Sequence, residues 1–224
     1  MDMPAGFKAH VDLANLDCKW FAPSLIFDLP FPGTQAFKAL VDDLGPFKPE
    51  ANRIAVEAPT GKVSDVAIRF GLRDGDIDLA FFYTGFRLLL RPFDKSYEKD
   101  LAPLVKCAAS HVGIGGLVSP GGRFSVRYQA HLRFPEASVD AIFQEVVVSR
   151  VSGFEPNGCS FSFRPPDVPR LKAAKFLVEH SAKIELGLFL ECNLEFDGSG
   201  DLDPLPALAM EVVGYAIESI GILL

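Results

Sequence analysis

The chain has 224 residues, of which 49% are hydrophobic and 23% are charged, and its 29 acidic and 22 basic residues give a formal net charge of −7. These figures exclude a disordered tail, a collagen-like rod and a small disulfide-stapled module, and they leave ample apolar surface for a core. The basic residues form no run, so the sequence does not predict a surface that follows nucleic-acid phosphates.

The first half of the sequence predicts one helix, a set of short strands and then a longer helix. Apolar residues at helical spacing begin after Thr34, and Gly45-Pro46 ends that pattern. Asp74-Gly75 is a dipeptide typical of a type I′ hairpin turn. The expected elements are an extended segment over 8–31, a helix over 34–44, strands over 53–59, 66–72, 77–82 and 86–91, and a helix ending near 112.

The second half repeats this order after a glycine-rich segment. Ser138 can cap a helix that presents Val139, Ile142, Phe143 and Val146 on one face. The expected elements are a strand over 124–134, this helix, strands over 159–163, 174–180 and 183–196, and a last helix from about 202 to 224.

Two short motifs recur between the halves at matching places. Phe31-Pro32 returns as Phe134-Pro135 before the first helix of each half, and Asp100-Leu101 with Pro103-Leu104 returns as Asp201-Leu202 with Pro204-Leu205 at the second helix. The agreement predicts an internal duplication, although Asp and Pro are common at helix starts in any protein. The expected units are a first repeat over 1–112, a linker over 113–123 and a second repeat over 124–224, packed as one pseudo-symmetric domain.

The predicted fold class is α+β, with an internally duplicated strand–helix–antiparallel sheet–helix order and a curved antiparallel sheet that carries its helices on one face. This plan resembles, in topology alone, the saddle of the TATA-box-binding protein and the helix-grip folds. The phenylalanine pairs with which that protein kinks DNA have no counterpart that can be placed in this sequence.

Nearly the whole chain is also similar to a sporadically distributed family of uncharacterised bacterial proteins of comparable length. The matching segments are 25–44, 66–112, the strand from Val126-Arg127-Tyr128 to Phe134-Pro135, and 188–224, while an aromatic segment of the family is kept only as Arg91-Pro92-Phe93. The resemblance implies no established activity.

The sequence predicts no assembled catalytic set, no cofactor site and no metal site. The glycine-rich segment 113–117 lies between a helix and a strand, the reverse of a dinucleotide fingerprint. The acidic segment 197–203 lacks the later ligands of a calcium loop and is expected to cap the final helix. His10, His111, His131 and His180 show no metal spacing, and His131 with Glu136 or His180 with Glu179 would pair only through the tertiary fold.

The phenylalanines and one polar strand face supply the candidate binding residues. An apolar pocket would be lined by Phe81, Phe161, Phe163 and Phe189, unless these side chains simply fill the core. Alternation in the strand over 124–134 groups polar side chains on one face. A positive stripe would consist of Arg127, Gln129, His131, Arg133, Arg87 and Arg91, unless its arginines pair with Glu185, Glu191 and Glu195 as on an ordinary solvated face.

The leading functional hypothesis is a non-enzymatic binding or interaction protein that uses the exposed curved sheet face. The alternative is a carrier or sensor of an apolar small ligand in a phenylalanine-lined helix-grip cavity, and an enzyme would need a buried titratable cluster. The expected partner is an unidentified protein or small ligand, with no nucleic acid and no membrane, and a homodimer is one option. The widely spaced Cys18, Cys107, Cys159 and Cys192 and the absence of a leader pattern predict a cytoplasmic location.

Overall fold

The computed structural model describes residues 6–22, 34–58, 60–62, 65–112, 121–146, 158–163, 165 and 167–224. Three sequence-based expectations lie outside these residues: the extended segment over 23–31, the Phe31-Pro32 motif and most of the glycine-rich linker.

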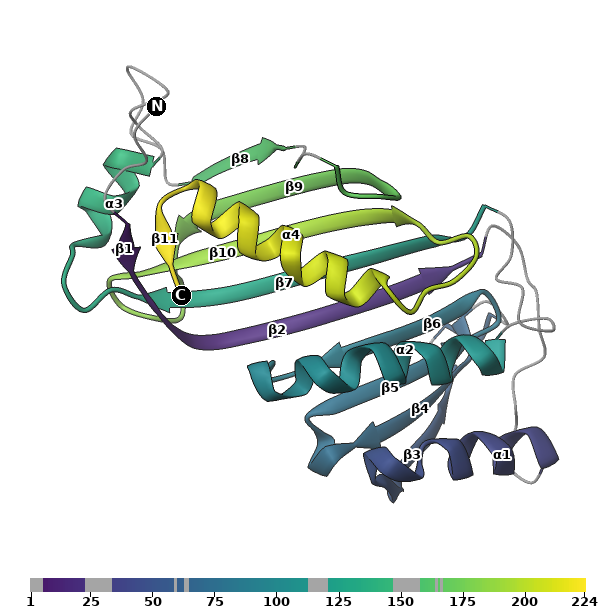
Figure 1. Cartoon of the computed structure of the whole chain (residues 1–224). Helices are drawn as coiled ribbons and strands as arrows, with labels where there is room; N and C mark the ends of the chain where they lie inside the picture. Colours follow the sequence, from purple (N-terminus) through teal and green to yellow (C-terminus); the bar gives the residue numbers. More distant parts are fainter. Residues whose placement is uncertain are drawn as a thin grey trace.

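A nine-stranded antiparallel sheet organises the described chain (Figure 1). Its strand order is β3-β4-β5-β6-β2-β7-β10-β9-β8, so that β2 and β7 lie side by side at the centre. The strands are β2 (His10–Phe21), β3 (Pro49–Glu57), β4 (Ala67–Leu72), β5 (Ile77–Phe82), β6 (Gly85–Leu90), β7 (Arg123–Arg133), β8 (Gly158–Ser162), β9 (Leu171–His180) and β10 (Gly187–Asp197). A separate parallel pair joins β1 (Phe7–Lys8) to β11 (Ile222–Leu223).

Four α-helices accompany the sheet in the described residues: α1 (Gln35–Asp43), α2 (Glu98–Val112), α3 (Val139–Val146) and α4 (Leu205–Ser219). The two long helices, α2 and α4, cross the same face of the sheet and touch each other above its centre (Figure 1). The opposite face has no helix on it among the described elements and is called the open face below. Short 3₁₀ segments, η1 (Gly45–Phe47), η3 (Arg73–Gly75) and η4 (Lys95–Tyr97), complete the connections.

The α+β class with a curved antiparallel sheet and helices on one face, predicted from the sequence, is confirmed. The two halves of the sheet are arranged alike on either side of the central β2–β7 pair. β2 pairs with β6, the last strand of the first half, and β7 pairs with β10, the last strand of the second half. Each central strand is followed in sequence by a helix and then by strands that lead back to it. A duplicated origin of the two halves, with the boundaries given above, stays a prediction.

Local details differ from the expected elements at turns. The hairpin of β4 and β5 forms, but its turn spans 73–76, and Arg73, Asp74 and Gly75 all have positive φ, so it is longer than a two-residue type I′ turn. The expected strand over 183–196 begins only at Gly187, because 181–186 form the turn between β9 and β10. The last helix begins at Leu205 rather than near 202.

The core lies between the sheet and the helices. Side chains that alternate toward the helices are almost fully buried, among them Trp20, Phe124, Phe196 and Leu88. The Trp20 indole donates a hydrogen bond of 2.9 Å to the carbonyl of Gly198, which satisfies its only polar atom in the core. Close backbone approach at the start of β6 requires glycine: a Cβ on Gly85 would lie 1.8 Å from the Trp20 carbonyl oxygen.

Candidate functional site

The polar face predicted for β7 is the open face of the sheet. Arg127 and Arg133 are exposed there, while Val126 and Tyr128, which alternate with them, are buried toward the helices. The grouping predicted from alternation is therefore correct in geometry. Arg91, by contrast, lies beyond the end of β6 and is not part of this face's strands.

Two arginines of the open face, Arg87 and Arg133, are paired with acids, and Arg127 is bound to a neutral amide. Arg87 binds Asp17 with two parallel hydrogen bonds of 2.8 and 2.9 Å, and Arg133 lies 2.8 Å from a carboxylate oxygen of Asp12. The Nε of Arg127 donates to Asn193 at 2.8 Å. The face therefore has mixed charge in place of the uniformly positive stripe predicted from the sequence, because Asp12 and Asp17 of β2 pair with Arg133 and Arg87. Those partners are mainly acids other than the Glu185, Glu191 and Glu195 suggested by the sequence.

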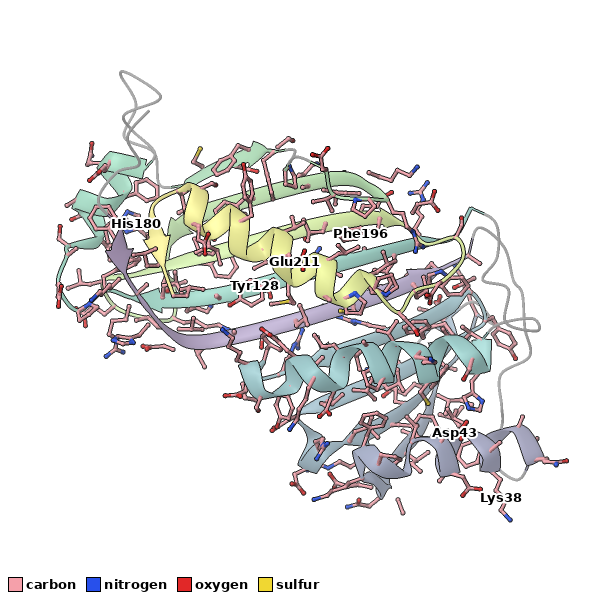
Figure 2. All side chains as sticks on the ribbon, viewed as in Figure 1. Lys38, Asp43, Tyr128, His180, Phe196 and Glu211 are labelled. Carbon is pink, nitrogen blue, oxygen red and sulfur yellow. The ribbon has the colours of Figure 1, made fainter. Side chains whose placement is uncertain are left out.

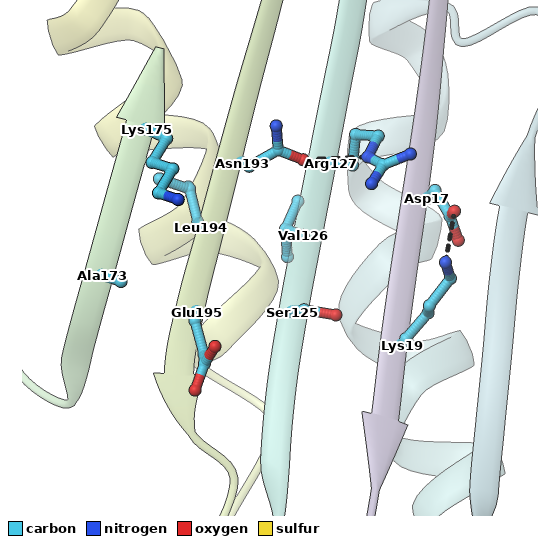
Figure 3. A pocket seen from close by; sticks show the side chains of 10 residues that line it. All are labelled: Asp17, Lys19, Ser125, Val126, Arg127, Ala173, Lys175, Asn193, Leu194 and Glu195. Atoms are coloured by element: carbon cyan, nitrogen blue, oxygen red, sulfur yellow. Dashed lines mark hydrogen bonds and ion pairs between the residues drawn. The ribbon is translucent and has the colours of Figure 1, made fainter. Parts of the chain in front are cut away.

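A small hollow of about 230 Å³ lies on the open face across β2, β7, β10 and β9 (Figure 3). Its charged lining consists of three basic side chains, those of Lys19, Arg127 and Lys175, and two acidic ones, those of Asp17 and Glu195. Lys19 is already paired with Asp17 at 3.1 Å. This hollow is shallow and internally compensated, so it is the weaker of the candidate sites.

The four phenylalanines of the expected apolar pocket do not meet. Phe81 is fully buried in the first half, where its ring meets Phe70 edge-on with centroids 6.0 Å apart. Phe161 and Phe163 pack against Phe176 at 5.4 and 6.4 Å. Phe189 lies on the open face beside His131, with centroids 4.9 Å apart. The predicted cavity is wrong, because strand register places these rings in separate clusters and on opposite faces.

A groove of about 500 Å³ with much apolar lining lies on the helix-covered side, between α4, η4 with the start of α2, and the ends of β2 and β11. We call it the α4 groove. Tyr128 of β7 reaches it from the sheet beneath α4 (Figure 2). Its lining residues are Val11, Ala14, Phe93, Asp94, Lys95, Glu98, Tyr128, Met210, Val213, Gly214, Ile217, Glu218, Ile222 and Leu224.

Tyr128 is the buried polar residue of the α4 groove. Its side chain is held by an edge-on contact with Phe93, with ring centroids 6.1 Å apart, and only 5% of the residue is exposed. Burial and, to a smaller extent, the negative charge of Glu98 raise the pKa of the hydroxyl to about 12, so it stays neutral near pH 7. No described residue hydrogen-bonds to this hydroxyl. The hydroxyl oxygen itself is not enclosed by the protein, so it is accessible from the groove as a donor and an acceptor.

Gly214 keeps the middle of the groove open. It lies in the interior of α4, where glycine costs roughly 1 kcal/mol relative to alanine. A Cβ at this position would meet no atom within 4 Å, and the backbone does not have the positive φ that favours glycine. Neither packing nor backbone conformation therefore requires glycine here, whereas a larger side chain would project into the groove that this residue lines.

Acidic side chains predominate at the rim of the groove. Asp94, Glu98 and Glu218 line it with a single basic residue, Lys95. Asp94 caps η4 by accepting the Ser96 N–H at 2.7 Å. Hydrogen bonding to the Ser96 side chain and, second, to its backbone N–H lowers the pKa of the Asp94 carboxyl group. Glu98 and Glu218 are exposed, and neither has an ion pair with any described residue. The groove continues between α2 and α4 into a second hollow of about 450 Å³ that shares Lys95, Glu98 and Met210 with it.

The histidines occupy separate places. His111 contacts Asp43 across α2 and α1 at 2.8 Å, and His180 lies 4.0 Å from Asp140. His131 lies 2.8 Å from the Ser181 hydroxyl, not near Glu136 as the sequence suggested. Within the part of the chain that the structure describes, no three side chains of the metal-ligating types gather.

The acidic segment over 197–203 is a turn that leads into the final helix. Asp197 accepts the Ser199 N–H at 2.9 Å, and Asp201 accepts the Asp203 N–H at 2.9 Å. The guanidinium of Arg170 donates to the carbonyls of Asp197, Ser199 and Asp201, which fixes the turn from the side. None of these side chains caps the final helix, whose N-cap is Pro204 without a side-chain hydrogen bond, so the capping role expected from the sequence is wrong.

Sequence reasoning missed the α4 groove, although two signals were present. Alternation correctly turned Tyr128 toward the helices, but the lack of a partner for its hydroxyl depends on the distant segments around Phe93 and Gly214. Gly214 itself interrupts an otherwise strongly apolar helical pattern, and an isolated helix glycine is a recognised sign of a packing or functional requirement.

Comparisons with known proteins were made for the whole chain. No protein-family model matches it, and no curated protein matches it. Eight chains of solved structures match, among them the rolling circle replication initiator protein from Geobacillus stearothermophilus. That match covers 96% of this chain and 85% of the other, with 11% sequence identity and a TM-score of 0.36. No described helix is long and apolar enough to cross a membrane.

The function predicted from the sequence does not agree with this comparison and is wrong. The leading hypothesis depended on the absence of a catalytic set and on polar alternation in the strand over 124–134, and the open face that carries this alternation has mixed charge. The phenylalanine-lined cavity of the alternative does not form. A TM-score of 0.36 does not transfer the other protein's activity to this chain.

Proposed function

We propose that the protein binds a small amphiphilic molecule in the α4 groove. The observation that carries this proposal is Gly214, which weakens α4 without a packing or backbone requirement and leaves the groove open. A helix-interior glycine that lines a groove, where alanine would fit and would favour the helix, is a feature expected of a ligand site.

The dimensions and lining of the groove support the same conclusion. Small-molecule sites are concave, have volumes of roughly 300–1,000 Å³ and combine an apolar lining with a few polar groups. The α4 groove, at about 500 Å³, lies in this range. Val213, Ile217 and Phe93 provide apolar surface, and the unsatisfied hydroxyl of Tyr128 provides a polar anchor at the bottom.

The proposal is tested by blocking the groove from Gly214. The Gly214→Leu variant places a side chain in the open space, and the Gly45→Leu variant serves as a matched control, because a Cβ on Gly45 also meets nothing within 4 Å but lies outside the groove. The probes are octylamine, octanol and octanoate below their micelle concentrations, titrated into ¹⁵N-labelled protein and followed by backbone amide shifts.

We expect at least one probe to shift the amides of α4 and of the segment around Phe93 in a saturable manner. Gly214→Leu should weaken that binding by tenfold or more, and Gly45→Leu should leave it unchanged. Failure of all three probes to bind, or equal binding by the Gly214→Leu variant, would contradict the proposal.

We also infer a cytoplasmic location. All four cysteines are unpaired in the described structure, and Cys18 and Cys192 are buried in the core, where burial raises the pKa of the Cys192 thiol to about 12 and keeps it unreactive. Intact mass of the protein isolated under alkylating conditions tests this inference. Four alkylated thiols after unfolding support it, and a disulfide in the isolated protein would contradict it.

A further inference from the structure

We infer that the ligand of the α4 groove carries an ammonium group, so that it is a primary alkyl- or arylalkylamine rather than a neutral or acidic amphiphile. This inference rests on the proposed function and specifies the chemical class of its ligand.

The charges at the rim favour a cation. Three carboxylates, those of Asp94, Glu98 and Glu218, line the groove together with one ammonium group, that of Lys95. Glu98 and Glu218 have no cationic partner among the described residues, whereas the acids of the open face are mostly paired. A carboxylate or phosphate ligand would add a like charge to this rim, and a cation would supply the missing counter-charge.

The hydroxyl of Tyr128 is suited to the same group. Its oxygen has two free acceptor positions and is held at the bottom of the groove by the contact of its ring with Phe93. An ammonium group donates three hydrogen bonds and accepts none, so it can use both this oxygen and the carboxylate of Glu98. Both Glu98 and Tyr128 line the α4 groove.

Phe93 and Tyr128 also provide aromatic surface to the groove. Their rings meet edge to face, at 89°. Ring faces attract an ammonium group by their quadrupole, and this attraction strengthens where water is excluded. The apolar remainder of the ligand would then lie along Val213, Gly214 and Ile217.

The length of the groove sets the shape of the apolar part. The hollow between α2 and α4 shares Lys95, Glu98 and Met210 with the α4 groove and continues away from Tyr128. An unbranched chain or a single aromatic ring on a short linker can follow this path.

The experiment compares octylamine, octanol and octanoate, which share one chain and differ only in the end group. Affinities are measured by calorimetry at pH 7 for the native protein, for the double variant Glu98→Gln with Glu218→Gln, and for Tyr128→Phe. Glu185→Gln is the matched control, because Glu185 is an exposed, unpaired acid in the turn between β9 and β10, away from the groove.

We expect octylamine to bind about tenfold more tightly than octanol, and octanoate to bind most weakly. The double glutamate variant should bring octylamine to the affinity of octanol, Tyr128→Phe should weaken both, and Glu185→Gln should change neither. If octanol or octanoate binds as tightly as octylamine and Gly214→Leu blocks it, the ammonium inference is overturned while the proposed function stands. If no probe binds the native protein, both are overturned.

Discussion

Replacement of Gly214 by alanine should stabilise the protein, which is an unusual expectation for a substitution on a helix that packs on the core. The backbone of Gly214 has no positive φ, and the new methyl group would meet no atom within 4 Å. The substitution therefore brings no clash. Its effect comes from the smaller conformational freedom of alanine in the unfolded chain and from its higher helix propensity.

The size of this effect follows from the position of the residue. Gly214 lies well inside a 15-residue helix, so nearly the full difference between glycine and alanine applies, about 0.5–1 kcal/mol. The methyl group gains little from burial, because it faces the groove. For a chain of this length the gain corresponds to a rise in Tm of about 1–4 °C.

Thermal and urea unfolding followed by circular dichroism measure the change. Gly85→Ala is the matched comparison, since the same substitution there would place the Cβ 1.8 Å from the Trp20 carbonyl oxygen and should cost about 2 kcal/mol or more. A lower Tm for Gly214→Ala would refute the reasoning, because it would mean that packing or backbone geometry requires glycine at that position.

Three further changes test the contacts that support the sheet and its turns. Asp17→Ala should lower the free energy of unfolding by about 2 kcal/mol in urea titrations, because it leaves the guanidinium of Arg87 without its paired carboxylate; an unchanged midpoint would contradict this. Arg170→Met should cost a similar amount, about 2 kcal/mol, by freeing the carbonyls of the 197–201 turn, and Arg170→Lys should recover only part of it. Burial and, to a smaller extent, the positive charge of Lys183 lower the pKa of His131. The unfolded chain therefore binds more protons than the native one below about pH 6.5. Stability should therefore fall as the pH drops from 7 toward 5, and His131→Phe should flatten that dependence; an equal slope in the variant would contradict the assignment.

The parts of the fold that could be predicted are those that depend on neighbouring residues in the sequence. Strand alternation placed Arg127 and Tyr128 on opposite faces, and the apolar spacing of α4 predicted its buried side. The positions of Phe81 and Phe189 on opposite faces depend on the register of strands far apart in the chain, and local patterns carry no information on it.

The candidate site could not be predicted for the same physical reason. The α4 groove is formed where α4, η4 and β2 meet, and its two informative features are absences: a missing side chain at Gly214 and a missing partner for the Tyr128 hydroxyl. The sequence shows which residues are present, but an open groove or a missing hydrogen-bond partner depends on how distant segments pack in the folded chain. Likewise, the arginines of the open face looked free because the acids that neutralise them lie on other strands, as Asp17 does for Arg87.

Intermolecular nuclear Overhauser effects between octylamine and the native protein test the central claim most directly. We expect the methylene protons of the probe to show contacts with the ring of Tyr128 and the methyl groups of Val213 and Ile217, which would place the chain in the α4 groove. Contacts with open-face side chains such as Leu177, or none with α4 at saturating probe, would contradict the assignment of the groove as the binding site.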